Sequence, residues 1–197
     1  MKYNYLFFLR RYKQIEDDFL DIIDFIELQN DFNHPSYYIG SSKLMDFCLK
    51  VGTEVETLFR EILESKRFDS VNNLTEKRRN QNINVYRKVI EPIYRLKEYK
   101  LLVTLIDKEI QPFEKFHLKG NPEWFGIYSK YKHNKIELIK EWNLKHSLFS
   151  LGCLLILVIN HPSLDKKVFR RHKVSQRVFD LLSSIPRFGV GTISISY

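Results

Sequence analysis

The sequence predicts a mainly α-helical domain, and three observations carry this prediction. Apolar residues recur every three or four positions in residues 4–30 and again in residues 41–66, as on the buried face of a helix. Residues 148–159 form a nearly continuous apolar run that is too short to cross a bilayer and is typical of a central, buried helix. Only 7 Gly and 6 Pro are present, too few for the many tight turns of an all-β fold. We therefore expect an up-and-down helical bundle.

The first two helices are predicted from their apolar stripes. Residues 4–30 carry one such stripe, and residues 30–40, with Pro35 and Gly40, form a loop. Ser41 or Ser42 can cap the second helix, because a serine side chain accepts a hydrogen bond from a free backbone N–H in the first turn. This second helix is expected to end near residue 66, and residues 67–81 are expected to form a loop.

Three further helices are predicted in the second half of the chain. Residues 85–96 are helical in pattern, although Pro92 must kink this helix or start a new turn. Residues 101–106 are apolar and short, and periodicity does not decide between a strand and a helix. Asn121 is expected to cap a helix with Pro122 in its first turn. The last helix runs over residues 144–160, where His161-Pro162 stops it.

A change in composition divides the chain into a bundle, residues 1–164, and a basic tail, residues 165–197, that packs on the same domain. The tail carries many cations against only Asp165 and Asp180. Its apolar residues, Val168, Phe169, Val178, Leu181 and Leu182, suggest a basic amphipathic helix.

The net charge of +8 and the pI near 9.3 favour polyanions such as RNA as partners. The alternative is a lysine-rich surface that is only solvated, because 24 acidic residues are interspersed among the 32 basic ones. Cys48 and Cys153 lie far apart in apolar stretches and are expected to be reduced core thiols, as in a cytoplasmic protein. Neither a signal peptide nor a membrane-spanning segment is expected.

Common catalytic motifs are missing from the sequence. It contains no Walker loop, no Gly-x-Gly-x-x-Gly, no His-Glu-x-x-His and no zinc-binding Cys/His spacing. Asp17, Asp21 and Asp24 could together hold a divalent ion, but an acidic solvated face explains their spacing better. We therefore expect no metal and no cofactor.

Residues 124–135 are the densest polar and aromatic stretch. Tyr128 could stack on a base, and Lys135 could bind a phosphate. Arg170 and Arg171 of the tail could bind phosphates as well. The alternative is structural, since Trp124, Tyr128 and Tyr131 have the spacing of a core-facing stripe.

A buried carboxylate suggests one specific contact with this stretch. Glu54 falls on or beside the apolar stripe of the second helix, and a buried charge requires a partner. The alternative is an edge position from which the carboxylate reaches water. We expect Glu54 to pair with Lys132 or His133, either as a structural tie or as the floor of a pocket. Lys132, His133 and Glu54 are therefore the candidate catalytic residues.

The order Trp124, Tyr128 and Lys132-His133-Asn134-Lys135 before a long apolar helix resembles the HEPN-like helical proteins of bacteria. In the first half, Tyr38-Ile39-Gly40-Ser41 and Thr53-Glu54-Val55-Glu56 are similar to that group's early segments, so the likeness spans residues 10–160. The resemblance implies an HEPN-like bundle, often a homodimer, associated with RNA in stress or phage defence, where toxin–antitoxin pairs are common.

The sequence departs from that family at its catalytic motif. Active members are metal-independent ribonucleases with an Arg followed by four to six residues and then a His, and no histidine here has an Arg at that spacing. Lys140 with His146 comes nearest, with Asn143 between them, but lysine lacks the planar fork of arginine that grips phosphate in two places. The two leading functions are an RNA-associated domain and a non-catalytic, dimerising module that binds a protein partner. A third is a small-molecule or metal enzyme that uses Asp17, Asp21 and Asp24 or the histidines.

Overall fold

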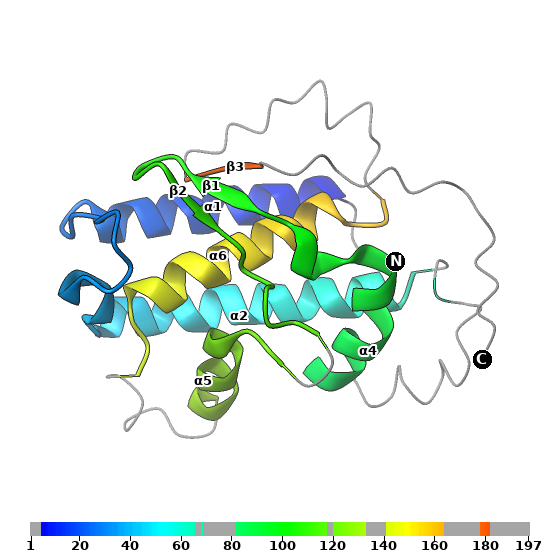
Figure 1. The fold of residues 1–197 in the computed structure, drawn as a ribbon. Coiled ribbons are helices and arrows are strands. Elements are labelled where there is room, and N and C mark those ends of the chain that lie inside the picture. The colour runs from blue at the N-terminus through cyan, green and yellow to red at the C-terminus, as the bar shows by residue number, and fades with distance from the viewer. Residues whose placement is uncertain are drawn as a thin grey trace.

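The computed structural model describes residues 5–65, 68, 82–117, 120–132, 141–163 and 178–181. Helices dominate this part of the chain, and a small three-stranded sheet lies against them (Figure 1). The mainly α-helical prediction with a short strand is confirmed. Arg170, Arg171, His133 and Lys135 lie outside the described residues.

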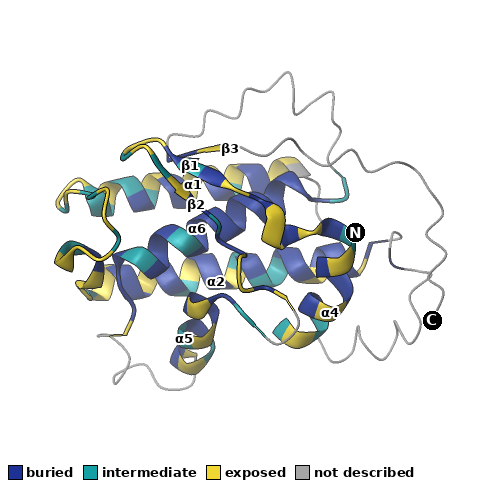
Figure 2. Ribbon diagram, viewed as in Figure 1, coloured by how far each residue is buried: buried dark blue, intermediate teal, exposed yellow. Residues whose placement is uncertain are grey.

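Three long helices form the core: α1 (Tyr5–Ile23), α2 (Ser42–Leu63) and α6 (Leu144–Ile159). Helix α6 packs against both of the others, and nearly all of its residues are buried (Figure 2). This confirms the prediction of a central helix from the apolar run, because a helix that is apolar on all sides must be covered on all sides. Helix α1 ends earlier than its stripe suggested, and residues 24–41 form the connection to α2, with a 3-10 turn, η1 (Pro35–Tyr38).

Side-chain caps fix where two core helices begin. The hydroxyl of Ser41 accepts a hydrogen bond from the backbone N–H of Leu44 at 3.2 Å, so the predicted serine cap is confirmed. Asn143 does the same at the start of α6, where it accepts from the N–H of His146 at 3.0 Å. Each cap satisfies a donor that the helix itself leaves free.

Helix α4 (Ile83–Tyr94) contains Pro92 within its last turn and is followed by a 3-10 turn, η3 (Leu96–Glu98). Arg95, between the two, adopts a left-handed backbone conformation with φ of 51°. The helix therefore begins and ends about two residues earlier than predicted. A proline removes a single N–H donor, which a short final turn tolerates.

The sheet has the order β2-β1-β3 and is antiparallel throughout, with strands β1 (Leu101–Val103), β2 (Lys108–Ile110) and β3 (Phe179–Leu181). Strand β3 corrects the prediction that the apolar residues of the tail belong to one helix. Residues 178–181 are extended, and Val178 and Phe179 are fully buried. The buried carboxylate of Glu16 accepts the backbone N–H of Val178 at 3.2 Å, which ties this segment to α1.

Helix α5 (Glu123–Tyr131) lies beside α2 and α6. Asn121 is not its cap, contrary to the prediction, because the side chain of Asn121 accepts a hydrogen bond from Arg87 of α4 at 2.6 Å. Arg87 also donates to the carbonyl of Gly120 at 3.1 Å. The guanidinium thus holds the segment that leads into α5.

The ring of Tyr128 packs directly on the backbone of α2 at Gly52, where an added Cβ would lie 2.3 Å from the ring. Cys48 and Cys153 are buried free thiols, as predicted, and burial raises the pKa of both. No helix in the described residues combines the length and apolarity that a bilayer crossing requires.

Candidate functional site

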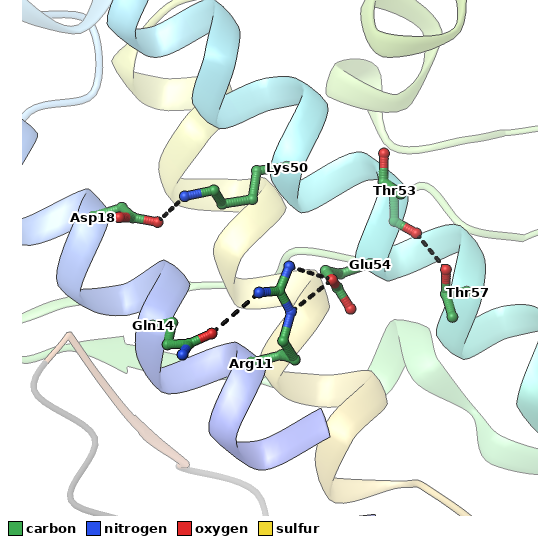
Figure 3. Close-up of polar contacts among 7 residues, drawn as sticks. All are labelled: Arg11, Gln14, Asp18, Lys50, Thr53, Glu54 and Thr57. Atoms are coloured by element: carbon green, nitrogen blue, oxygen red, sulfur yellow. Dashed lines mark hydrogen bonds and ion pairs between the residues drawn. The ribbon is translucent and has the colours of Figure 1, made fainter. Parts of the chain in front are cut away.

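The α1–α2 seam is the polar contact row in which Glu54 lies. It consists of the pairs Arg11–Glu54, Arg11–Gln14 and Lys50–Asp18 (Figure 3). Nε and Nη2 of Arg11 both donate to one oxygen of Glu54, at 3.0 and 2.8 Å. The prediction that Glu54 needs a partner is confirmed, since its side chain is only 13% exposed. The prediction that this partner is Lys132 is wrong.

Lys132 pairs instead with Glu56, two residues further along α2. Its ammonium lies 2.5 Å from the carboxylate of Glu56 and 4.5 Å from the centre of the Tyr128 ring. Burial acts to lower the pKa of Lys132, but its hydrogen bonds with Glu56 and Tyr128 outweigh that effect, so the pKa is raised. Lys132 therefore stays charged and acts as a tie between α5 and α2, not as a base.

Tyr128 is fully buried, and its hydroxyl donates to the carboxylate of Glu56 at 3.2 Å. One side of the ring meets Gly52, and Lys132 lies over the ring. Such a ring offers no free face on which a nucleobase could stack. The structural interpretation of the aromatic stripe holds, because Trp124 and Tyr131 are buried as well.

A pocket of about 200 Å³ opens where α5 and α6 begin. Three segments line it: the turn after β2, the start of α5 and the first turns of α6. The residues of this α5–α6 pocket are Gln111, Pro112, Glu114, Lys115, Pro122, Glu123, Trp124, Lys145, His146 and Phe149. No pattern in the sequence groups these residues, and only the spacing of Lys140, Asn143 and His146 points to this region.

His146 is the buried titratable group of the α5–α6 pocket. Its Nδ1 lies 3.1 Å from the backbone carbonyl of Glu141, and a carbonyl can only accept, so Nδ1 carries the proton. In the neutral ring, Nε2 then holds the lone pair. Nε2 faces the carboxylate of Glu123 at 3.8 Å, which is beyond hydrogen-bond distance.

The surroundings of His146 favour the neutral ring. Burial lowers the pKa of His146, and the charge of Glu123 and the hydrogen bond to Glu141 offset this only in part. The ring packs on Trp142, with centroids 5.7 Å apart. At neutral pH, His146 therefore presents an unprotonated nitrogen, which can accept a hydrogen bond or a proton.

The charges around this nitrogen are not neutralised by partners. Lys115 and Lys145 line the pocket, and neither forms an ion pair within the described part of the chain. The side chain of Glu123 is 68% exposed, and its carboxylate lies 3.8 Å from Nε2 of His146. The first turns of α5 and α6 add the positive ends of two helix dipoles. The pocket can therefore take a polar ligand that carries negative charge at one end.

No group of three or more His, Cys, Asp or Glu in the described residues is arranged to hold a metal ion. Comparison of the chain with protein-family models, with curated proteins and with solved structures found no match.

Proposed function

We propose that this chain is an HEPN-like helical domain that binds RNA at the α5–α6 pocket, in bacterial stress or phage defence. The observation that carries the proposal is the neutral His146, whose Nε2 lies in the lining of an open pocket. Lys115 and Lys145 line the same pocket and form no ion pair with the residues that the structure describes. Lysines attract phosphates without regard to sequence, and the net charge of +8 adds to this attraction.

The salt dependence of binding to a labelled single-stranded RNA tests this proposal. Each phosphate contact on a single strand contributes about 0.7 to the slope of log K against log salt. Replacing both Lys115 and Lys145 by Gln should therefore weaken binding and reduce the slope by about 1.4. The matched control replaces Lys13 and Lys43 by Gln, because both are exposed, on α1 and α2, and neither lines the pocket. Equal effects of the two double substitutions, or salt-independent affinity, would contradict the proposal.

Running the same samples on a gel with EDTA decides between binding and cleavage. Intact RNA assigns a binding role, whereas fragments that disappear with His146→Asn assign a metal-independent ribonuclease with His146 as the base. His34→Asn is the control, because His34 is an exposed histidine far along the chain from the pocket.

A second function, a dimerising interaction module, is favoured by one observation. Three large apolar side chains are exposed in the connection between α1 and α2: Phe25 at 84%, Tyr38 and Ile39. Exposed apolar groups of this size often mark a protein contact. Light scattering across a concentration series should detect a dimer that Phe25→Ser weakens, and a monomer at all concentrations would leave only the RNA proposal.

A further inference from the structure

The α5–α6 pocket has apolar walls of a particular kind. Pro112, Pro122, Trp124 and Phe149 contribute to its lining, and Phe149 is half-buried at its edge. Trp124 and Pro122 are buried, so they give this part of the lining an apolar character. Of the parts of an RNA, the uncharged nucleobase matches an apolar lining and the charged phosphate does not.

Beside the two lysines, the lining of the pocket also carries acceptors. Glu114 and Glu123 contribute carboxylates, and neutral His146 contributes the lone pair of Nε2. Oε1 of Glu123 lies 3.8 Å from that nitrogen, so the two do not satisfy each other and both can accept from a ligand placed between them. A phosphate offers no donor to these groups and would be repelled by the carboxylates.

The pocket therefore offers two kinds of polar group. The ammonium groups of Lys115 and Lys145 suit the negative backbone, whereas Glu123 and His146 suit a group that carries N–H donors. Exocyclic amino groups of cytosine, adenine and guanine are such donors, and uracil has a carbonyl oxygen where cytosine has its amino group. A carboxylate accepts a hydrogen bond from the amino group but faces the uracil oxygen with like partial charge.

We propose that the α5–α6 pocket receives a nucleobase with an exocyclic amino group, and that Glu123 is the residue that selects it. This inference rests on the proposed RNA binding and adds its specificity. Glu123 is suited to this role by its place in the first turn of α5. Arg87 holds the backbone just before it, and the side chain of Glu123 is 68% exposed and can meet a ligand.

Fluorescence anisotropy with labelled oligo(C) and oligo(U) tests the inference, because the two bases differ mainly at the group that Glu123 would contact. The unsubstituted protein should bind oligo(C) about tenfold more tightly than oligo(U). Glu123→Gln should bring this ratio close to one, since a glutamine amide can accept from cytosine or, after rotation, donate to uracil. The ratio is the quantity to compare, because the lost negative charge strengthens the binding of both oligomers.

Two controls make the result specific. Glu109→Gln removes the same charge from an exposed carboxylate on β2, outside the pocket, and should leave the ratio unchanged. An oligomer of N4,N4-dimethylcytidine lacks the amino donors and should bind the unsubstituted protein like oligo(U). Equal affinity for oligo(C) and oligo(U), or a ratio that survives Glu123→Gln, would overturn the base selection and leave RNA binding intact. No binding of either oligomer at low salt would overturn both.

Discussion

The α1–α2 seam and the α5–α6 pocket both place a carboxylate beside a basic group, but they leave these groups in opposite states. In the seam, Arg11 donates twice to Glu54 and once to Gln14, at distances of 2.8–3.1 Å (Figure 3). In the pocket, Glu123 and His146 stay 3.8 Å apart. The seam thus satisfies its own polar groups, whereas the pocket leaves acceptors and cations open to a ligand.

The comparison separates polar groups that hold the fold from those available for function. A satisfied, partly exposed ion pair contributes little to stability but fixes which faces of two helices meet. The open polar atoms at the starts of the two helices do not join these helices to each other, so other contacts must position them. Those contacts are Arg87 before α5, Gly52 beneath Tyr128 and the Asn143 cap of α6.

The largest expected effect concerns the contact that positions α5. Gly52→Ala places a Cβ 2.3 Å from the Tyr128 ring, so the ring or the helix must move. We expect a loss of roughly 1–3 kcal/mol in the free energy of unfolding, measured by denaturant titration. RNA affinity should fall as well, because α5 forms one wall of the pocket.

Gly126→Ala is the matched control for this substitution. Gly126 is exposed on α5, and an added Cβ there would meet nothing within 4 Å. Alanine should stabilise the helix by roughly 0.5–1 kcal/mol, because glycine loses more backbone entropy on folding. Destabilisation by Gly126→Ala, or no effect of Gly52→Ala, would show that α5 is not seated on α2 in this way.

A smaller effect is expected in the seam. A double-mutant cycle with Arg11→Met and Glu54→Gln should give a coupling of about 0.5–1 kcal/mol, because Arg11 is 39% exposed and solvent screens the pair. Neither substitution should change the preference for oligo(C) over oligo(U). A change in that preference would contradict the claim that the α1–α2 seam takes no part in ligand binding.

The smallest effect is a shift in the titration of His146, which NMR of its ring protons can follow. Burial should place its midpoint below the ordinary value near 6.5, and Glu123→Gln should lower it further, since the charge of Glu123 raises this pKa. The folded pKa lies below the unfolded one, so this group costs stability as pH falls below 6.5. If the titration midpoint of His146 rises in Glu123→Gln, the proposed electrostatic contact between Glu123 and His146 is contradicted.

Local patterns in the sequence predicted the helices well. The Ser41 cap and the stop at His161-Pro162 depend on neighbours within a few residues, and the structure confirms both. The pairing of β3 with β1 joins residues far apart in the chain, and three residues are too few for a periodic pattern to reveal. Local sequence patterns also could not show that the side chain of Asn121 accepts a hydrogen bond from Arg87, which lies far away in the chain, on α4.

The partner of Glu54 could not be predicted for a geometric reason. Helical spacing shows that a residue is partly buried but not which neighbouring helix lies opposite. Glu54 and Glu56 are separated by about 200° around α2, so one faces α1 and the other faces α5. The α5–α6 pocket was missed for the same reason, since Glu123 and His146 meet only because α5 and α6 begin at the same place.

An NMR titration with oligo(C) tests most directly whether the α5–α6 pocket binds the ligand and the α1–α2 seam does not. One sample reports both sites, through the ring signals of His146 and the Nε–H signal of Arg11. We expect the His146 signals to move with each addition of RNA while the Arg11 signal stays in place. Movement at Arg11 with a silent His146 would place the ligand elsewhere and contradict the account.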